Sequence, residues 1–276
     1  MKEKIYIILP VHNRKDTTSK FINCLKKQTY TNYHLILIDD GSNDGTDELV
    51  RNQIPYCTII RGNGNWWWGG SLQQGYLWLK KCKMSDNDIV LIINDDTTFE
   101  SDFLQNAVDI LKDKTKCLIQ AYAYSSESNL LIDKGTHVDW ENLTFNRLSD
   151  GNDINCLSTR GLFLKLNDFI ALKGFYPKLL PHYASDYAFT IRAFNKKYKL
   201  ISDIRLKIIS DESLTGLRKM EPKSIFNRIS LIFSKKYVLN PIYFTVFLLF
   251  SCPLKYLLKN TLKIWYGALK QLTVLN

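Results

Sequence analysis

The chain has 276 residues, of which 45% are hydrophobic and 23% are charged. This composition excludes disordered and fibrous proteins, and the length is enough to bury one sizeable core or two small ones. We therefore expect a globular domain of the size of an enzyme.

The net charge of +10 is concentrated near one end of the sequence. Residues 222–276 contain eight Lys or Arg residues and no Asp or Glu, which leaves a net charge of +2 for residues 1–221. Nucleic-acid binding calls for a basic face on the folded body, so the near-neutral body argues against it. The tail is the cationic part of the chain.

The six cysteines and the N-terminus indicate the compartment. The cysteines include no C-x-x-C pair, so they predict neither a zinc site nor a redox motif nor a disulfide framework. The apolar run Ile5–Leu9 is short and is followed by Pro10, so it reads as a buried strand rather than a signal peptide. We expect a cytoplasmic protein.

Residues 1–114 alternate apolar runs of strand length with amphipathic segments of helix length. The predicted strands are Ile5–Leu9, Leu35–Ile38, Cys57–Ile60 and Ile89–Ile93, and the helices that follow them are Thr17–Lys27, Thr46–Asn52, Gly70–Lys81 and Phe103–Leu111. This repeat predicts an α/β fold with a mainly parallel sheet that is covered on both faces. Its ligand site should lie at the carboxyl ends of the strands.

Residues 115–221 alternate less regularly, and we interpret them as an α+β half fused to the first. We expect strands near Cys117–Tyr124, Leu130–Val138, Cys156–Leu164 and Ile204–Ile209, and a helix near Asp186–Asn195.

The triplet Asn94-Asp95-Asp96 directly follows the apolar run Ile89–Ile93. Two adjacent carboxylates at the end of a buried strand offer the oxygen ligands that hard divalent cations prefer. The alternative is a solvated turn, because Asp and Asn are common after strands. Position alone leaves both interpretations open.

A second acidic segment, Asp39-Asp40-Gly41-Ser42, also follows an apolar strand and precedes a helix. A carboxylate here can accept a hydrogen bond from a nucleobase or a ribose hydroxyl. The alternative is a glycine-rich turn with Asp44 or Thr46 as the helix cap. A helix cap would account for Asp44 or Thr46 but would not explain the two carboxylates Asp39 and Asp40.

Three consecutive tryptophans, Trp66 to Trp68, lie in a glycine-rich segment that leads into a helix. The segment is not a dinucleotide loop, since bulky rings stand where that loop needs glycine. Three adjacent tryptophans cannot all face one core, so we expect at least one to border the cleft, where aromatic faces suit sugars or bases. Packing remains the alternative for the other two.

The helix near Asp186 is expected to begin with Ser185 as its cap and Asp186 in its first turn. Acids are common in this position because of the helix dipole, so the position alone assigns no function.

Taken together, these motifs resemble the family 2 glycosyltransferases over about residues 4 to 215. The resemblance rests on Ile8–Arg14, Leu37–Thr46, Asn94–Thr97 and Ser185-Asp186. The tryptophan segment and Gly161-Leu162-Phe163 are similar to the bacterial rhamnosyltransferase-like branch. The resemblance implies a GT-A fold, in which a Rossmann-like nucleotide-sugar half (1–114) joins an acceptor half (115–221). It also implies a nucleoside-diphosphate sugar donor, Mg²⁺ or Mn²⁺, and inversion at the anomeric carbon.

The resemblance also implies roles for single residues. Asp186 matches the catalytic base. The donor-binding residues are Pro10, His12, Asn13, Asp39, Asp40, Arg61, Trp68, Gly70 and Asp95. The metal ligands are Asp96, Asp95 and Asp211, and the acceptor-binding residues are Trp67, Gly161 and His182.

The sequence departs from the family pattern at three positions. Asn94 replaces the first acid of the usual D-x-D, which leaves fewer carboxylates for a metal. Ser185 stands where many members have Glu. Asp211 lies near the place where related enzymes often supply a His.

The tail, residues 222–276, is predicted to be helical and amphipathic. Lys255, Lys259, Lys263 and Lys270 fall on one helical face, a pattern typical of a helix lying on an anionic membrane surface. The uncharged stretch Tyr237–Leu254 is interrupted by Asn240 and two prolines, which favours shallow insertion over spanning. The alternatives are packing on the catalytic domain or a dimer contact.

The sequence therefore predicts an inverting glycosyltransferase that acts on a glycan or a lipid-linked acceptor at the inner face of a bacterial membrane, in cell-surface polysaccharide synthesis. One alternative is a sugar nucleotidyltransferase, which would want a glycine-rich loop where Pro10–Arg14 stands. The other is a non-catalytic nucleotide- or carbohydrate-binding protein, which has no need for Asp95, Asp96 and Asp186 together.

Overall fold

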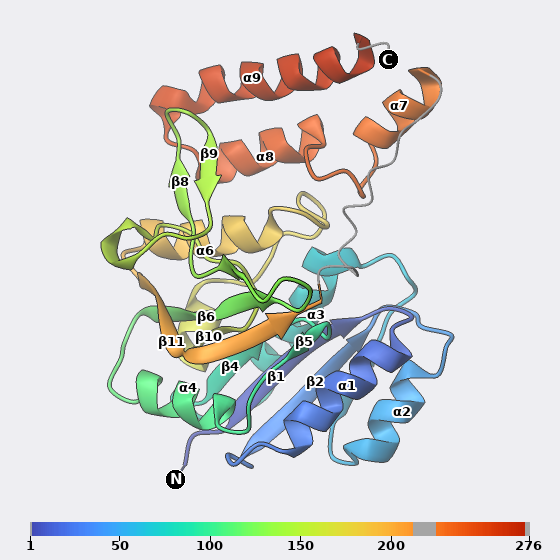
Figure 1. The fold of residues 1–276 in the computed structure, drawn as a ribbon, viewed down its shortest axis with the longest axis vertical. Coiled ribbons are helices and arrows are strands. Elements are labelled where there is room, and N and C mark those ends of the chain that lie inside the picture. Colours follow the sequence, from blue (N-terminus) through green and yellow to red (C-terminus); the bar gives the residue numbers. More distant parts are fainter. Residues whose placement is uncertain (1, 212–224, 274–276) are drawn as a thin grey trace.

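A computed structural model describes residues 2–211 and 225–273 (Figure 1). The expected boundary between domain and tail, at residues 221 and 222, lies outside these ranges.

The first half contains the expected β-α repeat. Its strands are β1 (Ile5–Val11), β2 (Tyr33–Asp39), β3 (Thr58–Arg61) and β4 (Ile89–Ile92), and its helices are α1 (Lys15–Lys26), α2 (Thr46–Gln53), α3 (Trp67–Lys81) and α4 (Phe103–Leu111). The four strands are parallel in the order β3-β2-β1-β4. The predicted segments are confirmed, with boundaries that differ by at most three residues.

Helices cover both faces of this sheet, which is why the strands read as unbroken apolar runs. Side chains alternate between the faces along a strand. In β1, Ile5 and Ile7 belong to one core cluster with Phe21 of α1, whereas Ile8 belongs to another with Leu72 of α3. All these side chains are fully buried.

The sheet continues into the second half of the chain. The strands added there are β6 (Cys117–Ser125), β7 (Leu131–Asp133), β10 (Leu162–Lys165) and β11 (Lys199–Ser210), and the short β5 (Thr97–Thr98) of the first half pairs with β11. Strand β10 lies antiparallel between β4 and β6, and β11 is parallel to β6. Within the described residues this gives one nine-stranded sheet that runs through both halves, so the division at residue 114 is not a break in the sheet.

Two strand predictions were wrong because glycines turn the chain. The segment Leu130–Val138 forms two short strands, β7 and β8 (His137–Asp139), separated at Gly135, whose φ is +111°. Strand β8 pairs with β9 (Thr144–Asn146) as a separate hairpin. Only the end of Cys156–Leu164 is a strand, since the chain turns at Gly161 with a φ of +67°. Such left-handed conformations favour glycine and interrupt a strand.

Three short elements complete the second half: a 3₁₀ turn η1 (Gly151–Asp153), α5 (Leu166–Ala171) and α6 (Ser185–Asn195). Ser185 was predicted to be the cap of α6, but it is the first residue of the helix. The cap is Ala184, which has a φ of +61°, and the Ser185 hydroxyl donates back to the carbonyl of His182.

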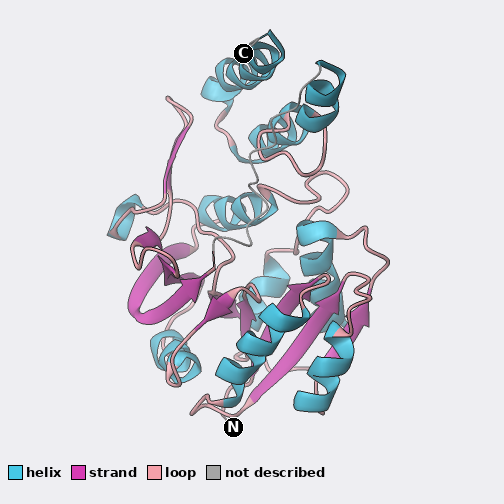
Figure 2. Cartoon of the chain, turned by 45° about the vertical axis from the view of Figure 1, so that its right-hand side comes forward, coloured by secondary structure: helices cyan, strands magenta, loops and turns pink. Residues whose placement is uncertain are grey.

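The described part of the tail, residues 225–273, forms three helices, α7 (Ile225–Ile232), α8 (Pro241–Ser251) and α9 (Leu254–Thr273). Helices α8 and α9 lie side by side at the end of the molecule opposite the parallel strands (Figures 1 and 2). Phe247 and Leu248 of α8 pack in one buried cluster with Ile191 of α6 and Val138 of β8. Packing of the tail on the domain, one of the alternatives, is thus what the structure shows.

Two of the four lysines that were predicted to share one face of α9 contact the domain. Lys259 and Lys263 donate to the carbonyls of Glu141 and Asn142 in the β8–β9 turn, at 2.8 and 2.5 Å. The apolar side chains on the outer side of α9 remain exposed: Leu254, Leu258, Leu262, Tyr266 and Leu269. None of the described helices is long and apolar enough to cross a membrane.

Candidate active site

A cavity of about 1050 Å³ lies between the carboxyl ends of the strands and the C-terminal helices. The position agrees with the rule for parallel sheets. Predicted site residues that line it are Pro10, His12, Asp40, Trp67, Trp68, Asp95, Asp96, His182 and Asp186. They come from β1, from α3, from the turns after β2 and β4, and from the start of α6.

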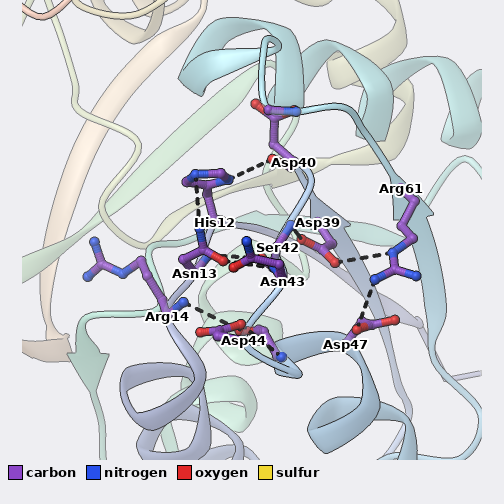
Figure 3. Close-up of polar contacts among 12 residues, drawn as sticks. His12, Asn13, Arg14, Asp39, Asp40, Ser42, Asn43, Asp44, Asp47 and Arg61 are labelled. Carbon is purple, nitrogen blue, oxygen red and sulfur yellow. Dashed lines mark hydrogen bonds and ion pairs between the residues drawn. The ribbon is translucent and has the colours of Figure 1, made fainter.

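Asp39 is fully buried at the end of β2, next to the rim of the cavity. One carboxylate oxygen accepts from the amide of Ser42 at 2.8 Å. The other, Oδ2, lies 3.6 Å from Arg61 Nε and has no hydrogen-bond partner among the described residues. Arg61 also pairs with Asp47 (Figure 3). Asp39 does not line the cavity, and its predicted contact with the donor stays a prediction.

Asp40 is engaged with the backbone. Its Oδ1 accepts from the amide of Gly64 at 2.9 Å, and its Oδ2 accepts from the amides of Trp66 and Trp67 at 2.8 and 3.0 Å. A Cβ on Gly41 would lie 2.7 Å from the Gly64 nitrogen, so glycine is needed where these loops meet. Both carboxylate oxygens therefore hold the loop, and the predicted contact of Asp40 with the donor stays a prediction.

His12 and Asn13 continue this network from the end of β1. His12 Nδ1 lies 2.7 Å from the carbonyl oxygen of Asp40 (Figure 3). Asn13 donates its amide to the Ser42 hydroxyl and accepts from the amide of Asn43. His12 lines the cavity, whereas Asn13 ties the turn after β1 to the turn after β2.

The tryptophan prediction is confirmed, because two of the three rings line the cavity. Trp67 has a φ of +57°, which is rare for a bulky residue, and its ring centre lies 5.5 Å from that of His182. Trp68 lines the cavity and donates from its indole to Thr159 at 3.3 Å. Trp66 packs against the core instead.

The two acids of the triplet are buried and do not form a solvated turn. Asp95 and Asp96 are 4% and 8% exposed. Arg14 lies against both, with Nε 3.0 Å from the Asp95 carboxylate and Nη2 3.3 Å from Asp96 Oδ2. Thr18 also donates to Asp95. Burial raises the pKa of Asp95 to about 6 and also raises the pKa of Asp96, while Arg14 opposes both shifts.

Oxygen atoms at this site suit a hard divalent cation. Oδ1 of Asp96 and Oδ1 of Asn94 are buried and have no hydrogen-bond partner among the described residues. Across residues 2–211 and 225–273, no group of three or more His, Cys, Asp or Glu side chains could by itself hold a metal ion. Asp211, the predicted third ligand, donates its backbone amide to the Asp96 carbonyl but does not complete such a group.

Asp186 lines the same cavity from the first turn of α6. Its Oδ1 accepts from the amide of Tyr187 at 2.9 Å. Burial raises the pKa of Asp186, and the Tyr187 amide and the positive charges of Arg147 and Arg160 oppose the shift. Both arginines also line the cavity.

Residues 6–198 match the family model described as glycosyl transferase family 2. The chain belongs to this family.

Similar proteins extend the comparison. The chain is 26% identical over 131 residues to the uncharacterised protein MJ1222 of Methanocaldococcus jannaschii, which covers 47% of this chain and 48% of that protein. The chain thus spans about half the length of that relative. It is 21% identical to the glycosyltransferase GlyG of Streptococcus pneumoniae, over 87% of this chain and 69% of GlyG.

A solved structure resembles the whole fold. It is the mannosyltransferase PcManGT from Pyrobaculum calidifontis, in complex with GDP-Man and Mn²⁺. The TM-score is 0.58 with 16% identity, over 96% of this chain and 75% of that one. The likeness supports the predicted GT-A fold.

Two predicted residues of this family 2 chain serve packing instead of lining the cavity. A Cβ on Gly70 would lie 3.0 Å from the Cβ of Trp66, and one on Gly161 would lie 3.0 Å from the Cβ of Ala121. Neither glycine lines the cavity, and their roles in donor and acceptor binding stay predictions.

His182 lines the cavity of the family 2 domain as predicted. Its Nδ1 is buried without a hydrogen-bond partner among the described residues, and burial lowers its pKa to about 4. The imidazole is therefore neutral at physiological pH, so it can contact a sugar without adding charge.

Sequence reasoning missed three arginines of the family 2 site: Arg14, Arg147 and Arg160. A signal was present for two of them, because Arg14 ends the segment Ile8–Arg14 and Arg160 precedes Gly161. Arg147 follows the β9 strand of a hairpin that periodicity did not predict.

Proposed function

We propose that this family 2 chain is a metal-dependent, inverting glycosyltransferase that moves a sugar from a nucleoside-diphosphate donor to a hydroxyl of a glycan or a lipid-linked acceptor. The observation that carries the proposal is that one cavity is lined by a buried carboxylate pair, Asp95 and Asp96, and by a separate, half-buried carboxylate, Asp186. Asp95 and Asp96 are suited to bind the diphosphate end of the donor through a cation, and Asp186 is suited to accept the proton of the attacking hydroxyl.

The donor would lie along the ends of β1, β2 and β4. Oδ2 of Asp39 accepts from the nucleoside, and Trp67 and Trp68 offer ring faces to the sugar. Asp96, with Asp95 and the Asn94 amide oxygen, would hold Mg²⁺ or Mn²⁺. When bound, such a cation stabilises negative charge on the departing diphosphate oxygen.

Asp186 acts as the general base in this proposal. In its ionised form it takes the proton of the acceptor hydroxyl while the hydroxyl oxygen attacks the anomeric carbon opposite the leaving diphosphate, which inverts the configuration. A positioned base of this kind contributes about 10²–10⁴ in rate. The positive charges of Arg147 and Arg160 favour the ionised form of this carboxylate and so oppose the effect of burial on its pKa.

The outer side of α9 supports a place on a membrane surface. Its exposed apolar side chains form the row Leu254, Leu258, Leu262, Tyr266 and Leu269, and Lys255 and Lys270 lie on the same helix. Apolar area and basic charge together favour an anionic bilayer. We place the enzyme as a peripheral protein on the cytoplasmic face of a bacterial membrane, in polysaccharide synthesis of the rhamnosyltransferase-like type.

Thermal-shift screening of nucleotide sugars with and without Mn²⁺ tests the donor and metal parts of the proposal. A ligand raises stability with the logarithm of its occupancy. We expect one donor to raise the melting temperature only with Mn²⁺, and Asp96→Asn to remove that rise. Asp113→Asn, at an exposed carboxylate, should keep it. A metal-independent rise in every variant would indicate a nucleotide-binding protein instead.

A further inference from the structure

The cavity extends beyond Asp186 to the C-terminal helices, where its walls become apolar. We call this part the apolar compartment. It is lined by Leu143 and Phe145 of the β8–β9 hairpin, Phe244 and Phe247 of α8, Ile264, Gly267 and Ala268 of α9, and Val238 and Leu239 before α8. These elements lie at the end of the molecule away from the parallel strands (Figure 1).

The cavity has room for more than one small ligand. Pockets for one small ligand measure roughly 300–1000 Å³, and this cavity, at about 1050 Å³, is larger than that range. A nucleotide sugar at the strand ends leaves the apolar compartment free for a second molecule. The walls of that compartment suit a hydrocarbon chain.

Three cations line the compartment. They are Arg147 after β9, Lys236 before α8, and Lys263 on α9. The described lining residues contributed by β9 and by residues 236–271 include no carboxylate. Lys263 is held in place by the carbonyl of Asn142, and Lys236 is exposed. The compartment thus combines an apolar wall with positive charge, a pair that matches a phosphate attached to an alkyl chain.

We propose that the acceptor is an amphiphile, in which a sugar is joined through a phosphate to an apolar chain. This inference rests on the proposed transferase function. The chain occupies the apolar compartment, the phosphate pairs with Lys236, Lys263 and Arg147, and the sugar hydroxyl reaches Asp186. The tail is then part of the acceptor site as well as a surface helix.

Gly267 offers a direct way to block the compartment. It lines the cavity, and a Cβ placed on it meets no atom within 4 Å. Gly267→Phe therefore fills the space without a clash at the backbone, and replacing a helical glycine also favours the helix. The matched control is Leu258→Phe on the same helix, where the side chain is 73% exposed and does not line the cavity.

Calorimetric titration with decyl phosphate, kept below its micelle concentration, tests the proposal. We expect one molecule to bind per chain, Gly267→Phe to weaken binding by about tenfold or more, and Leu258→Phe to leave it unchanged. Lys236→Ala should also weaken decyl phosphate. Inorganic phosphate should bind far more weakly than decyl phosphate, since it cannot use the apolar wall.

Binding of decyl phosphate that is equal in Gly267→Phe and the unaltered chain would overturn the proposal. So would equal weakening by Gly267→Phe and Leu258→Phe, because the chain would then lie on the outer side of α9. The proposal would also be overturned if inorganic phosphate bound as tightly as decyl phosphate. Nucleotide-sugar screening of the same variants separates the two proposals. If a donor still binds but decyl phosphate does not, the transferase proposal stands and only the proposal of an amphiphilic acceptor fails.

Discussion

Arg14 compensates the negative charge of two buried carboxylates. Its guanidinium contacts both Asp95 and Asp96, and removing the partner of a buried charge is costly. We expect Arg14→Met to reduce the free energy of unfolding by about 2–3 kcal/mol at pH 7.5 in the presence of EDTA, a value reduced because Arg14 is partly exposed. Chemical denaturation measures this loss.

Added Mn²⁺ should restore part of the stability of Arg14→Met, since a cation then joins the two carboxylates. The control is Arg51→Met at an exposed position of α2, which should change little in either condition. A loss for Arg14→Met that Mn²⁺ leaves untouched would mean that the pair does not bind the cation.

The pKa of Asp186 predicts how the rate of sugar transfer depends on pH. Its pKa is raised by burial above the usual value of about 4, and a base acts in its ionised form. The transfer rate should therefore fall as the pH drops through this raised pKa, which a pH profile of single-turnover transfer would show. A rate independent of pH between 4 and 8 would exclude Asp186 as the base.

The same shift has a consequence for folding. A carboxyl whose pKa is raised in the folded state contributes stability below its unfolded pKa, and that contribution is lost as the pH rises through the folded pKa. Asp186→Asn should therefore melt at a higher temperature than the unaltered chain at pH 8, with the difference vanishing near pH 3. Equal melting temperatures at both pH values would show that Asp186 is solvated in the fold.

At the scale of elements, the N-terminus of α3 is held in an unusual conformation. Trp67 has a φ of +57°, and its amide is fixed by Asp40. Glycine adopts this conformation freely, whereas alanine is strained by roughly 1 kcal/mol. We expect Trp67→Gly to be more stable than Trp67→Ala in denaturant titration.

Leu77, further along α3 and 38% exposed, is the matched control. There the usual helical order applies, and Leu77→Ala should be more stable than Leu77→Gly by up to about 1 kcal/mol. The same order at both positions would mean that Trp67 carries no backbone strain.

How far the sequence predicts these elements depends on what sets each one. Strands β1 and β4 were predicted because burial on both faces leaves an unbroken apolar run. The segments around Gly135 and Gly161 were predicted wrongly, since a positive φ at one residue ends a strand without changing the apolar pattern.

The site was predictable only where it lies at strand ends. Asp39 is the last residue of β2 and Asp96 lies in the turn after β4, so the parallel sheet brings them to one edge. Arg14 approaches Asp96 across 82 residues of sequence, and Arg147 reaches Asp186 from a separate hairpin. These approaches depend on tertiary packing, which no local pattern records.

At the scale of the whole molecule, the tail both closes the cavity and presents an apolar outer side. Deleting it from residue 222 would remove Phe247 and uncover its partners Val138 and Ile191, so a surface substitution is the sharper test of membrane association. We expect Leu258→Glu combined with Leu262→Glu to reduce flotation with anionic vesicles by about tenfold or more. A change of equal charge, Tyr56→Glu with Leu130→Glu, replaces exposed residues outside the tail and should leave flotation unchanged.

Unchanged flotation of the Leu258→Glu and Leu262→Glu variant would show that the outer side of α9 does not meet the bilayer. That result would leave the cavity and its chemistry untouched, because neither leucine lines the cavity.

The claim that Asp186 is the base of a metal-dependent transferase is tested most directly by release of nucleoside diphosphate. The assay uses the donor identified by thermal shift, Mn²⁺ and an amphiphilic sugar-phosphate acceptor. We expect the unaltered chain to release nucleoside diphosphate and Asp186→Asn to release it about 10²–10⁴ times more slowly, with donor binding unchanged. Equal release by Asp186→Asn and the unaltered chain would contradict the account.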